Sequence, residues 1–170
     1  LSRGVLNVSV VGGGTCNSEF EFLTDNSMAY VGTGKYPYNL YNFSKVNSLA
    51  KQFKSIGYGT AAIHPNIASN WNRDKVYPQL GFDQFLDIND FQGAPVFHNG
   101  VTDLATYQKI LELIQGSDKP MFITDITMQN HTGYDKNNIP ADRLTNYQLK
   151  NVSAYENAEF NEYVSCIKAS

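Results

Sequence analysis

Residues 44–64 read SKVNSLAKQFKSIGYGTAAIH, and this stretch decides the fold. Its first part predicts a helix, with Ser44 as the expected N-cap and Gly57 as the expected stop. The apolar residues on one stripe of that helix are Val46, Leu49, Ala50, Phe53 and Ile56. Its second part, YGTAAIH, has the length and composition of a short buried strand. A helix followed by a buried strand is the repeating unit of a parallel sheet covered by helices.

The same alternation continues on both sides of this stretch. Further strands are predicted at residues 4–13, 82–88 and 119–128, the first ending in a glycine turn. Further helices are predicted at residues 70–82, where Pro78 interrupts the pattern, at 102–116 and at about 146–168. In the helix at 102–116, Thr102 or Asp103 is the expected cap, and the apolar residues that share a face are Leu104, Tyr107, Leu111 and Ile114. We therefore expect an α/β fold with a mostly parallel sheet flanked by helices, in a single domain over residues 1–170.

Composition restricts the class of protein. The 170 residues are 42% apolar and 17% charged, which is typical of one water-soluble globular domain. A net charge of -3 offers no basic surface, so a nucleic-acid partner is not expected. No run has the length of a membrane helix, and Leu1 in place of a methionine suggests a piece of a longer protein. Cys16 and Cys166 match no metal or redox spacing.

Polar clusters follow three of the predicted strands. They contain Thr15, then His64 with Trp71 and Arg73, then Asn130 with His131. Ligands in parallel sheets bind at the carboxyl ends of strands, so these clusters are the candidate site. Tryptophan beside arginine offers an apolar wall and a forked cation to an anionic polyol or sugar phosphate. The alternative for His64 is a satisfied core histidine.

The other titratable candidates are weaker. His98 is expected in a solvated loop, so His131 is the better site candidate. Asp125 lies inside an apolar strand, and we expect a structural role for it.

The glycine turn before Thr15 fits neither common phosphate loop. GGGTCN has no lysine before Thr15, as a Walker loop needs, and lacks the third glycine of the dinucleotide fingerprint. What remains is a threonine hydroxyl on a tight turn, which is a nucleophile only if a base or metal activates it. The alternative is a turn with a small polar residue and no chemistry. Cys16 is expected to be a small buried hydrophobe.

Three motifs taken together resemble a known family. GGGTCNSEFEFLT (12–24), HPNIASNWNRDKVYPQLGFDQFLD (64–87) and TMQNHTGY (127–134) are similar to the extracytoplasmic enzyme domain of lipoteichoic acid synthases and related phosphoglycerol transferases. That family belongs to the alkaline phosphatase and sulfatase superfamily. The resemblance covers roughly Leu6 to Tyr134, and the middle motif is its most specific part.

The resemblance implies a role for each candidate residue. Thr15 would be the nucleophile on a phosphodiester and a ligand of a divalent cation, manganese or magnesium. His64, Trp71 and Arg73 would line the glycerol-phosphate pocket, with Arg73 pairing with the phosphate. His131 would contact the phosphoryl group or assist proton transfer. The implied substrate is a phosphatidylglycerol-like lipid or a polyglycerol-phosphate chain. The implied location is the extracytoplasmic face of the cell membrane, to which N-terminal helices would attach the parent protein.

The chain departs from the family in its metal ligands. The family uses an acidic residue well upstream of the threonine and an Asp-His pair well downstream, and this sequence contains neither. We therefore expect a soluble internal fragment that lacks the N-terminal strand and the C-terminal metal-binding segment, holds no metal tightly by itself and is close to inactive. The alternatives are a hydrolase of the sulfatase or phosphodiesterase type, or a non-catalytic module that binds glycerophosphate or glycan. Cys16 lacks the proline and arginine of the sulfatase Cys-x-Pro-x-Arg motif, which disfavours sulfate chemistry.

Overall fold

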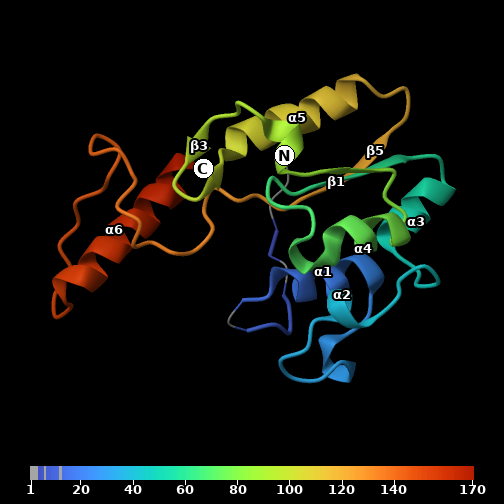
Figure 1. Ribbon diagram of the computed structural model, residues 1–170, viewed down its shortest axis with the longest axis horizontal. Coiled ribbons are helices and arrows are strands. Elements are labelled where there is room, and N and C mark those ends of the chain that lie inside the picture. The colour runs from blue at the N-terminus through green and yellow to red at the C-terminus, as the bar shows by residue number, and fades with distance from the viewer. Residues whose placement is uncertain (1–3, 6, 12) are drawn as a thin grey trace. The chain divides into compact units, whose positions relative to one another are not determined.

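The computed structural model describes residues 4, 5, 7–11 and 13–170. Helices alternate with short strands along most of the chain, as Figure 1 shows. The α-helices are α1 (Thr15–Thr24), α2 (Pro37–Leu40), α3 (Leu49–Ser55), α4 (Arg73–Gln79), α5 (Asp103–Gln115) and α6 (Ala154–Ala169). The strands are β1 (Gly59–Ile63), β2 (Gln84–Leu86), β3 (Val96–Phe97), β4 (Gly100–Val101) and β5 (Met121–Asp125). Short 3-10 turns are η1 (Met28–Tyr30), η2 (Asn70–Asn72) and η3 (Ile88–Phe91).

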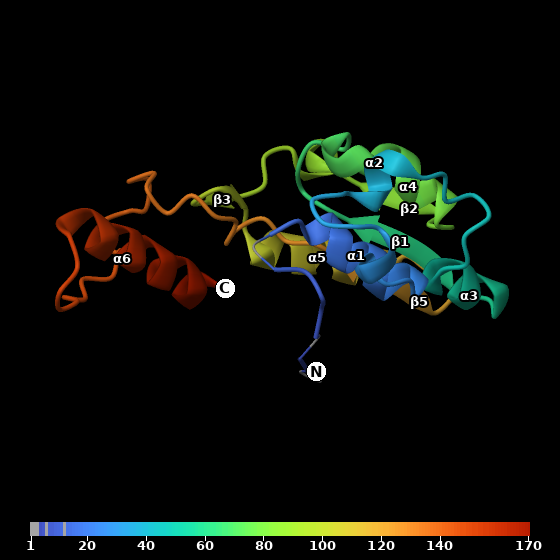
Figure 2. The same ribbon diagram turned by 90° about the horizontal axis from the view of Figure 1, so that it is seen from below.

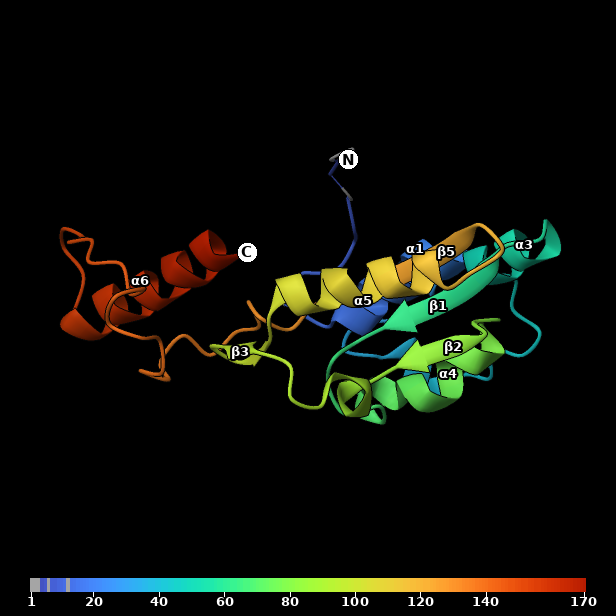
Figure 3. The ribbon, with the colours of Figure 1, turned by 90° about the horizontal axis from the view of Figure 1, so that it is seen from above.

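The main sheet has the strand order β2-β1-β5 and is parallel. At one end of the β1–β5 pair the amide of Gly59 donates to the carbonyl of Pro120, and at the other end the amide of Ile126 donates to Ile63 (both 2.9 Å). The partners advance in the same direction along both segments, which is the parallel pattern. The arrows of β1 and β2 likewise run side by side in one direction (Figure 3). The expected α/β fold class is confirmed.

The chain forms two compact units, each with its own core. The first unit comprises residues up to 62, 68–85 and 117–122, and the second comprises 63–67, 86–116 and 123–170. The first core contains Cys16, Phe20, Leu23, Tyr38, Phe43, Ala50, Ala62, Val76, Tyr77, Leu80 and Phe82. The second unit has one cluster of Ile63, Leu86, Phe91 and Val101, and another of Phe97, Ile139 and Cys166.

The N-terminal segment differs from the prediction. The described residues 4, 5 and 7–11 belong to no strand, while Leu6 and Gly12 of the predicted strand lie outside the described residues. Thr15 is the first residue of α1 and not the tip of a turn. Figure 2 shows this segment as the helix α1. The cause is a buried helical stripe of Cys16, Phe20 and Leu23, at positions i, i+4 and i+7, while Phe22 is 45% exposed.

The helix of the opening stretch begins later than predicted. Its N-cap is Ser48, whose hydroxyl accepts from the amide of Lys51 at 3.2 Å and donates to the carbonyl of Leu80. Ser44 lies outside the helix, where its hydroxyl donates to the side chain of Asn42. Gly57 follows the helix with a φ of 94°, so the predicted stop is confirmed.

The backbone before α4 breaks earlier than Pro78. Trp71 and Asn72, the last two residues of η2, adopt left-handed conformations, with φ of 57° and 54°, directly before α4. Pro78 lies inside the last turn of α4 and does not interrupt it. The predicted break in the helix is present, but Trp71 and Asn72 cause it rather than Pro78.

The helix predicted at 102–116 is α5, with Thr102 as its cap. The predicted apolar face of Leu104, Tyr107, Leu111 and Ile114 is exposed, each side chain by half or more. A second stripe, Thr106, Ile110 and Leu113, faces inward instead, with Ile110 and Leu113 packing on the core of its unit.

The last helix, α6, begins at Ala154 and not near residue 146, because Ser153 and Glu156 form a capping box there. None of the helices that the structure describes has the length and apolar character to cross a membrane.

The cap of α3 gives a direct test of the fold. Ser48→Ala removes the cap and leaves the Leu80 carbonyl without its partner, so it should lower the free energy of unfolding by roughly 1–2 kcal/mol. Ser44→Ala is the matched control and should change it by no more than a few tenths, because the Ser44 side chain is exposed and its hydroxyl donates to Asn42 at the surface. Urea denaturation followed by circular dichroism measures both. Equal losses in the two variants would contradict the assignment of the cap.

Candidate active site

Thr15 lies at the amino end of α1, immediately after two glycines in left-handed conformations. Gly13 and Gly14 have φ of 105° and 84°, values that only glycine adopts without strain. Gly14 occupies the N-cap position, has no side chain to cap the helix, and accepts from the amide of Asn17 at 2.8 Å. Thr15 itself is exposed. Its hydroxyl therefore lies where unpaired helix amides and the positive end of the helix dipole favour an anion.

A cavity of about 580 Å³ adjoins this end of α1 within the first unit. Its lining includes Gly13, Gly14, Asn17, Thr33 and Tyr36. A Cβ at Gly14 would lie 3.4 Å from the ring of Tyr36, so the glycine allows the chain to run close to this aromatic wall. The cavity is mostly bordered by backbone and small side chains, which suits a small polar ligand.

Trp71 is half-buried and stacks on Tyr36 in a tilted arrangement, with ring centroids 4.4 Å apart. Tyr36 thus contacts Trp71 and also borders the cavity beside Thr15. Sequence reasoning found Trp71 but missed Tyr36, because no spacing in the sequence marks one tyrosine among 11.

Arg73 is 2% exposed and pairs with Glu19 of α1 in the core. Its Nε donates to Glu19 Oε2 at 3.2 Å, its Nη2 donates to Oε1, and Tyr77 donates to Oε2 at 2.8 Å. Burial alone would lower the pKa of the guanidinium, but the bonded carboxylate outweighs this effect and raises that pKa. The described conformation thus gives Arg73 a protein carboxylate as its partner. Its expected pairing with a phosphate stays a prediction.

Cys16 is fully buried, and its pKa is raised to about 12 by burial and by the nearby charge of Glu19. A thiol with this pKa is protonated at neutral pH and is a poor nucleophile. The expected small buried hydrophobe is confirmed.

His64 lies at the end of β1, in the second unit, and is 3% exposed. Its Nδ1 lies 2.9 Å from the carbonyl of Ile126. A carbonyl can only accept, so Nδ1 carries the proton. This bond fits the interpretation of His64 as a satisfied core histidine, and its predicted role in a glycerol-phosphate pocket stays a prediction.

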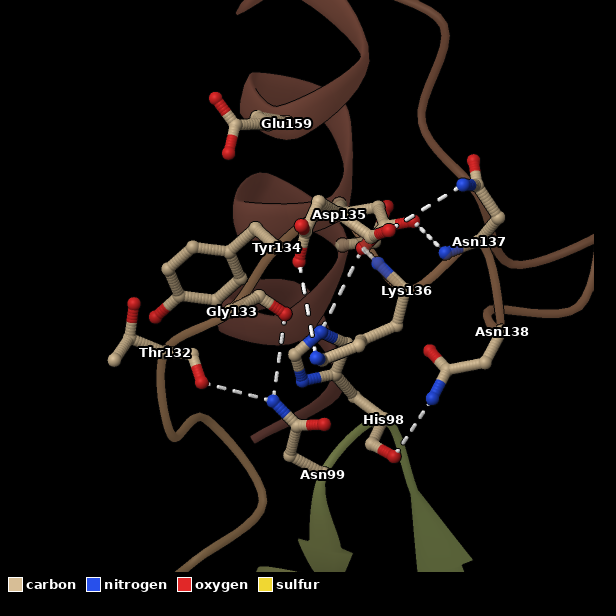
Figure 4. A network of polar contacts seen from close by, with 12 residues as sticks. His98, Asn99, Thr132, Gly133, Tyr134, Asp135, Lys136, Asn137, Asn138 and Glu159 are labelled. Atoms are coloured by element: carbon tan, nitrogen blue, oxygen red, sulfur yellow. Dashed lines mark hydrogen bonds and ion pairs between the residues drawn. The ribbon is translucent and has the colours of Figure 1, made fainter.

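His131 is exposed, in a loop that one side chain holds in place. The amide of Asn99 donates to the carbonyls of His131 and Thr132, both at 3.0 Å, and lies 3.4 Å from that of Gly133. Figure 4 shows the contacts with Thr132 and Gly133. Asn99 occupies the turn between β3 and β4, so this hairpin fixes the backbone that carries His131. Sequence reasoning missed Asn99; its only signal was an Asn-Gly pair typical of hairpin turns.

The expected solvated position of His98 is wrong. Its side chain is buried, stacks on Tyr134 with centroids 5.4 Å apart, and places Nε2 3.6 Å from Glu162 of α6 (Figure 4). Glu162 also accepts from the amides of Lys136 and Asn137, at 3.1 Å and 2.5 Å. The loop and α6 pack over the hairpin, and this return of the chain buries a residue that the local sequence marks as exposed.

The described residues alone do not fit a divalent cation. No three His, Cys, Asp or Glu side chains lie close enough to hold one, within the part of the chain that the structure describes. The carboxylates nearest in sequence to Thr15 are engaged: Glu19 binds Arg73, and Glu21 accepts from Ser9 and from the amide of Met28. A hydroxyl on its own is a poor ligand for manganese or magnesium, so Thr15 by itself does not make a metal site.

Comparison with known families settles the relationship. The sulfatase family matches residues 2–169. The chain belongs to this family. A Rhizobium meliloti protein named for cyclic β-1,2-glucan modification is 34% identical over 126 residues, 74% of this chain and 20% of the relative. The lipoteichoic acid synthase-like protein YvgJ of Bacillus subtilis is 26% identical over 120 residues, 69% of this chain and 19% of the relative.

Among solved structures, the Streptococcus pyogenes phosphoglycerol transferase GacH, in complex with sn-glycerol-1-phosphate, has a TM-score of 0.78 at 26% identity. The match covers 95% of this chain and 43% of that one. These findings confirm the resemblance to the lipoteichoic acid synthase and phosphoglycerol transferase family of the alkaline phosphatase superfamily. The chain spans about a fifth of the length of the two curated relatives.

Two buried carboxylates lie outside the predicted site. Among the residues that the structure describes, Asp125, at the end of β5, has no hydrogen-bond partner on either carboxylate oxygen, and Asp103, at the start of α5, has none on Oδ1. Burial, followed by the charge of Asp103, raises the pKa of Asp125 from 3.8 to about 6. In its expected structural role, Asp125 therefore lowers the free energy of unfolding at neutral pH, where its buried carboxyl is ionised.

The raised pKa of Asp125 predicts that the free energy of unfolding depends on pH. An acid with a raised pKa binds its proton more tightly in the folded state, so the stability it contributes is present below pH 4 and is lost as the pH rises through about 6. Asp125→Asn removes this loss, and its stability relative to wild type should grow by roughly 1–3 kcal/mol between pH 4 and pH 7. Urea denaturation at several pH values measures the difference.

The matched control is Asp83→Asn. The hydrogen bond from Lys54 holds the pKa of Asp83 below its ordinary value of 3.8, so that carboxylate contributes stability above pH 3.8 that is lost as the pH falls through the lowered pKa. Asp83→Asn should therefore lose stability relative to wild type as the pH rises from 3 to 5. Stability curves for Asp125→Asn and wild type that stay parallel would contradict the prediction.

The ligand set also predicts weak metal binding. Calorimetric titration of the chain with manganese should show no tight stoichiometric binding, because the described residues contain no group of three His, Cys, Asp or Glu side chains that could hold a metal ion. Binding of one manganese ion at micromolar concentration or below, lost in Thr15→Ala, would contradict this expectation.

Proposed function

We propose that this chain carries the nucleophile-bearing part of a phosphoglycerol transferase of the lipoteichoic acid synthase type, with Thr15 as the nucleophile. The observation that supports this most directly is the position of Thr15. It is the exposed first residue of α1 and directly follows two left-handed glycines, Gly13 and Gly14, which line a cavity of about 580 Å³. The family relationship supplies the reaction class, and the helix end supplies an anion site at the reacting group.

The proposed reaction has two displacements at phosphorus. The Thr15 hydroxyl loses its proton as its oxygen bonds to the phosphorus of a glycerol-phosphate ester, and the leaving alcohol takes up a proton as its bond to phosphorus breaks. An acceptor hydroxyl then loses its proton as its oxygen bonds to phosphorus, and the Thr15 oxygen takes up a proton as its bond to phosphorus breaks. The amides of the first turn of α1 stabilise the negative charge on the phosphoryl oxygens in both steps. His131 keeps its predicted role of contacting the phosphoryl group or assisting proton transfer.

The proposed substrate is a glycerol-phosphate ester, either a phosphatidylglycerol-like lipid or a polyglycerol-phosphate chain. GacH was solved with sn-glycerol-1-phosphate, and the small cavity with its wall of Tyr36 offers a matching space. Trp71, stacked on that wall, keeps its predicted role in the headgroup pocket, as do His64 and Arg73. The same proposal puts the reaction at the extracytoplasmic face of a membrane. It also includes dependence on manganese or magnesium, held by ligands outside the described residues.

Binding of sn-glycerol-1-phosphate tests the proposal on this chain. Nuclear magnetic resonance of the labelled protein should show perturbed amides at Thr15 and Trp71. Thr15→Ala should weaken the affinity about tenfold through the loss of a hydrogen bond to a charged group. Cys16→Ala, which changes the neighbouring buried residue, should leave the affinity unchanged.

The covalent step separates the alternatives. Incubation with a fluorescent phosphatidylglycerol and manganese should give a glycerophosphoryl adduct on Thr15, detected by mass spectrometry, in any form of the protein that is active. An adduct released only to water would favour the hydrolase, and tight binding with no adduct would favour the non-catalytic module. An adduct on Cys16 would overturn the nucleophile assignment.

A further inference from the structure

A buried ion pair connects the two sequence motifs that carry Thr15 and Trp71. Glu19 lies one helical turn after Thr15 on α1, and residues four apart share a helix face. Arg73 is the first residue of α4 and follows Trp71 by two positions. The pair thus joins the helix that presents the proposed nucleophile to the segment that presents the aromatic wall.

The geometry of the pair fixes the relative orientation of the Glu19 and Arg73 side chains as well as the distance between them. Both oxygens of Glu19 accept from the guanidinium, through Nε and Nη2 of Arg73, and Tyr77 adds a third donor. A two-pronged bond between a carboxylate and a planar guanidinium restricts rotation of both groups. The side chains of Glu19 and Arg73 are 3% and 2% exposed, so water competes little for these bonds.

Arg73 passes this constraint on to the backbone that carries Trp71. Its Nη1 lies 3.4 Å from the carbonyl of Asn70, at the start of η2. Between Asn70 and Arg73 the chain adopts two left-handed residues, Trp71 and Asn72, a conformation with a cost for side chains of this kind. A fixed Arg73 holds both ends of this strained turn.

We propose that Glu19 is a positioning residue of the candidate site: through Arg73 it sets the position of Trp71 relative to Thr15. The proposal rests on the proposed function for its consequence, which is affinity for a glycerol phosphate. The coupling itself exists without a ligand. A buried ion pair contributes little net stability compared with an apolar pair of the same shape, so its main effect is on geometry.

The single tryptophan of the chain makes the coupling measurable. In Glu19→Gln, Arg73 loses its charged partner, and we expect a shift of Trp71 fluorescence emission, a displaced amide resonance for Thr15, and at least tenfold weaker binding of sn-glycerol-1-phosphate. Glu19→Asp keeps the charge on a shorter side chain and should restore part of each signal. Tyr77→Phe is the matched control: it removes one bond to the same carboxylate, keeps the ion pair, and should leave the Trp71 and Thr15 signals at their wild-type values.

A second variant distinguishes loss of positioning from loss of folding. The double variant Glu19→Met with Arg73→Met removes both charges and leaves none unpaired, so it should remain folded by circular dichroism. If Glu19 positions the site, Trp71 emission and the Thr15 resonance stay displaced in this double variant. Wild-type signals in the folded double variant, or in folded Glu19→Gln, would overturn the proposal and leave the pair as a core contact.

The same measurements separate this proposal from the proposed function. Failure of the wild-type chain to bind sn-glycerol-1-phosphate would count against the function, while the ligand-free signals of Trp71 and Thr15 would still decide the role of Glu19.

Discussion

The first unit depends on one buried interaction, the pair of Glu19 and Arg73. Transfer of two charges into a protein core costs several kcal/mol for each ion unless partners replace the lost water. Here the carboxylate accepts hydrogen bonds from the guanidinium and from the hydroxyl of Tyr77, and both Glu19 and Arg73 are buried. The arrangement of α1 and α4 is therefore constrained by hydrogen-bond geometry in addition to apolar packing, which tolerates small displacements more readily.

The periodicity of the sequence was enough to predict the sheet and most of the helices. Runs such as residues 59–63 and 121–125 are short and apolar, and the helices between them have stripes of their own. Ends of elements were harder, because they depend on contacts between distant residues. Ser44 and Ser48 are equally good caps by type, and the carbonyl of Leu80, far along the chain, favours Ser48. In α1, the spacing of Phe20 and Phe22 mimicked a strand and concealed the helical stripe.

The candidate site was predicted by residue type and spacing, but the partners of its residues were not. Thr15 and Trp71 stand out in the sequence through the glycines before one and the rarity of the other. Glu19, Tyr36 and Asn99 are ordinary residues whose importance comes from what they contact in three dimensions. The same reason explains His98: a loop sequence marks it as exposed, and only the packing of α6 buries it.

The hydrogen bonds from Asn99 to the His131 loop depend on a side-chain amide that can be hydrolysed over time. Asn99 precedes Gly100, and asparagine is among the thermolabile residues of proteins. Hydrolysis of its side-chain amide would replace a group that donates to backbone carbonyls with a carboxylate that repels them. Deamidation of Asn99 alone would thus release the backbone around His131, while every candidate site residue would stay chemically unchanged.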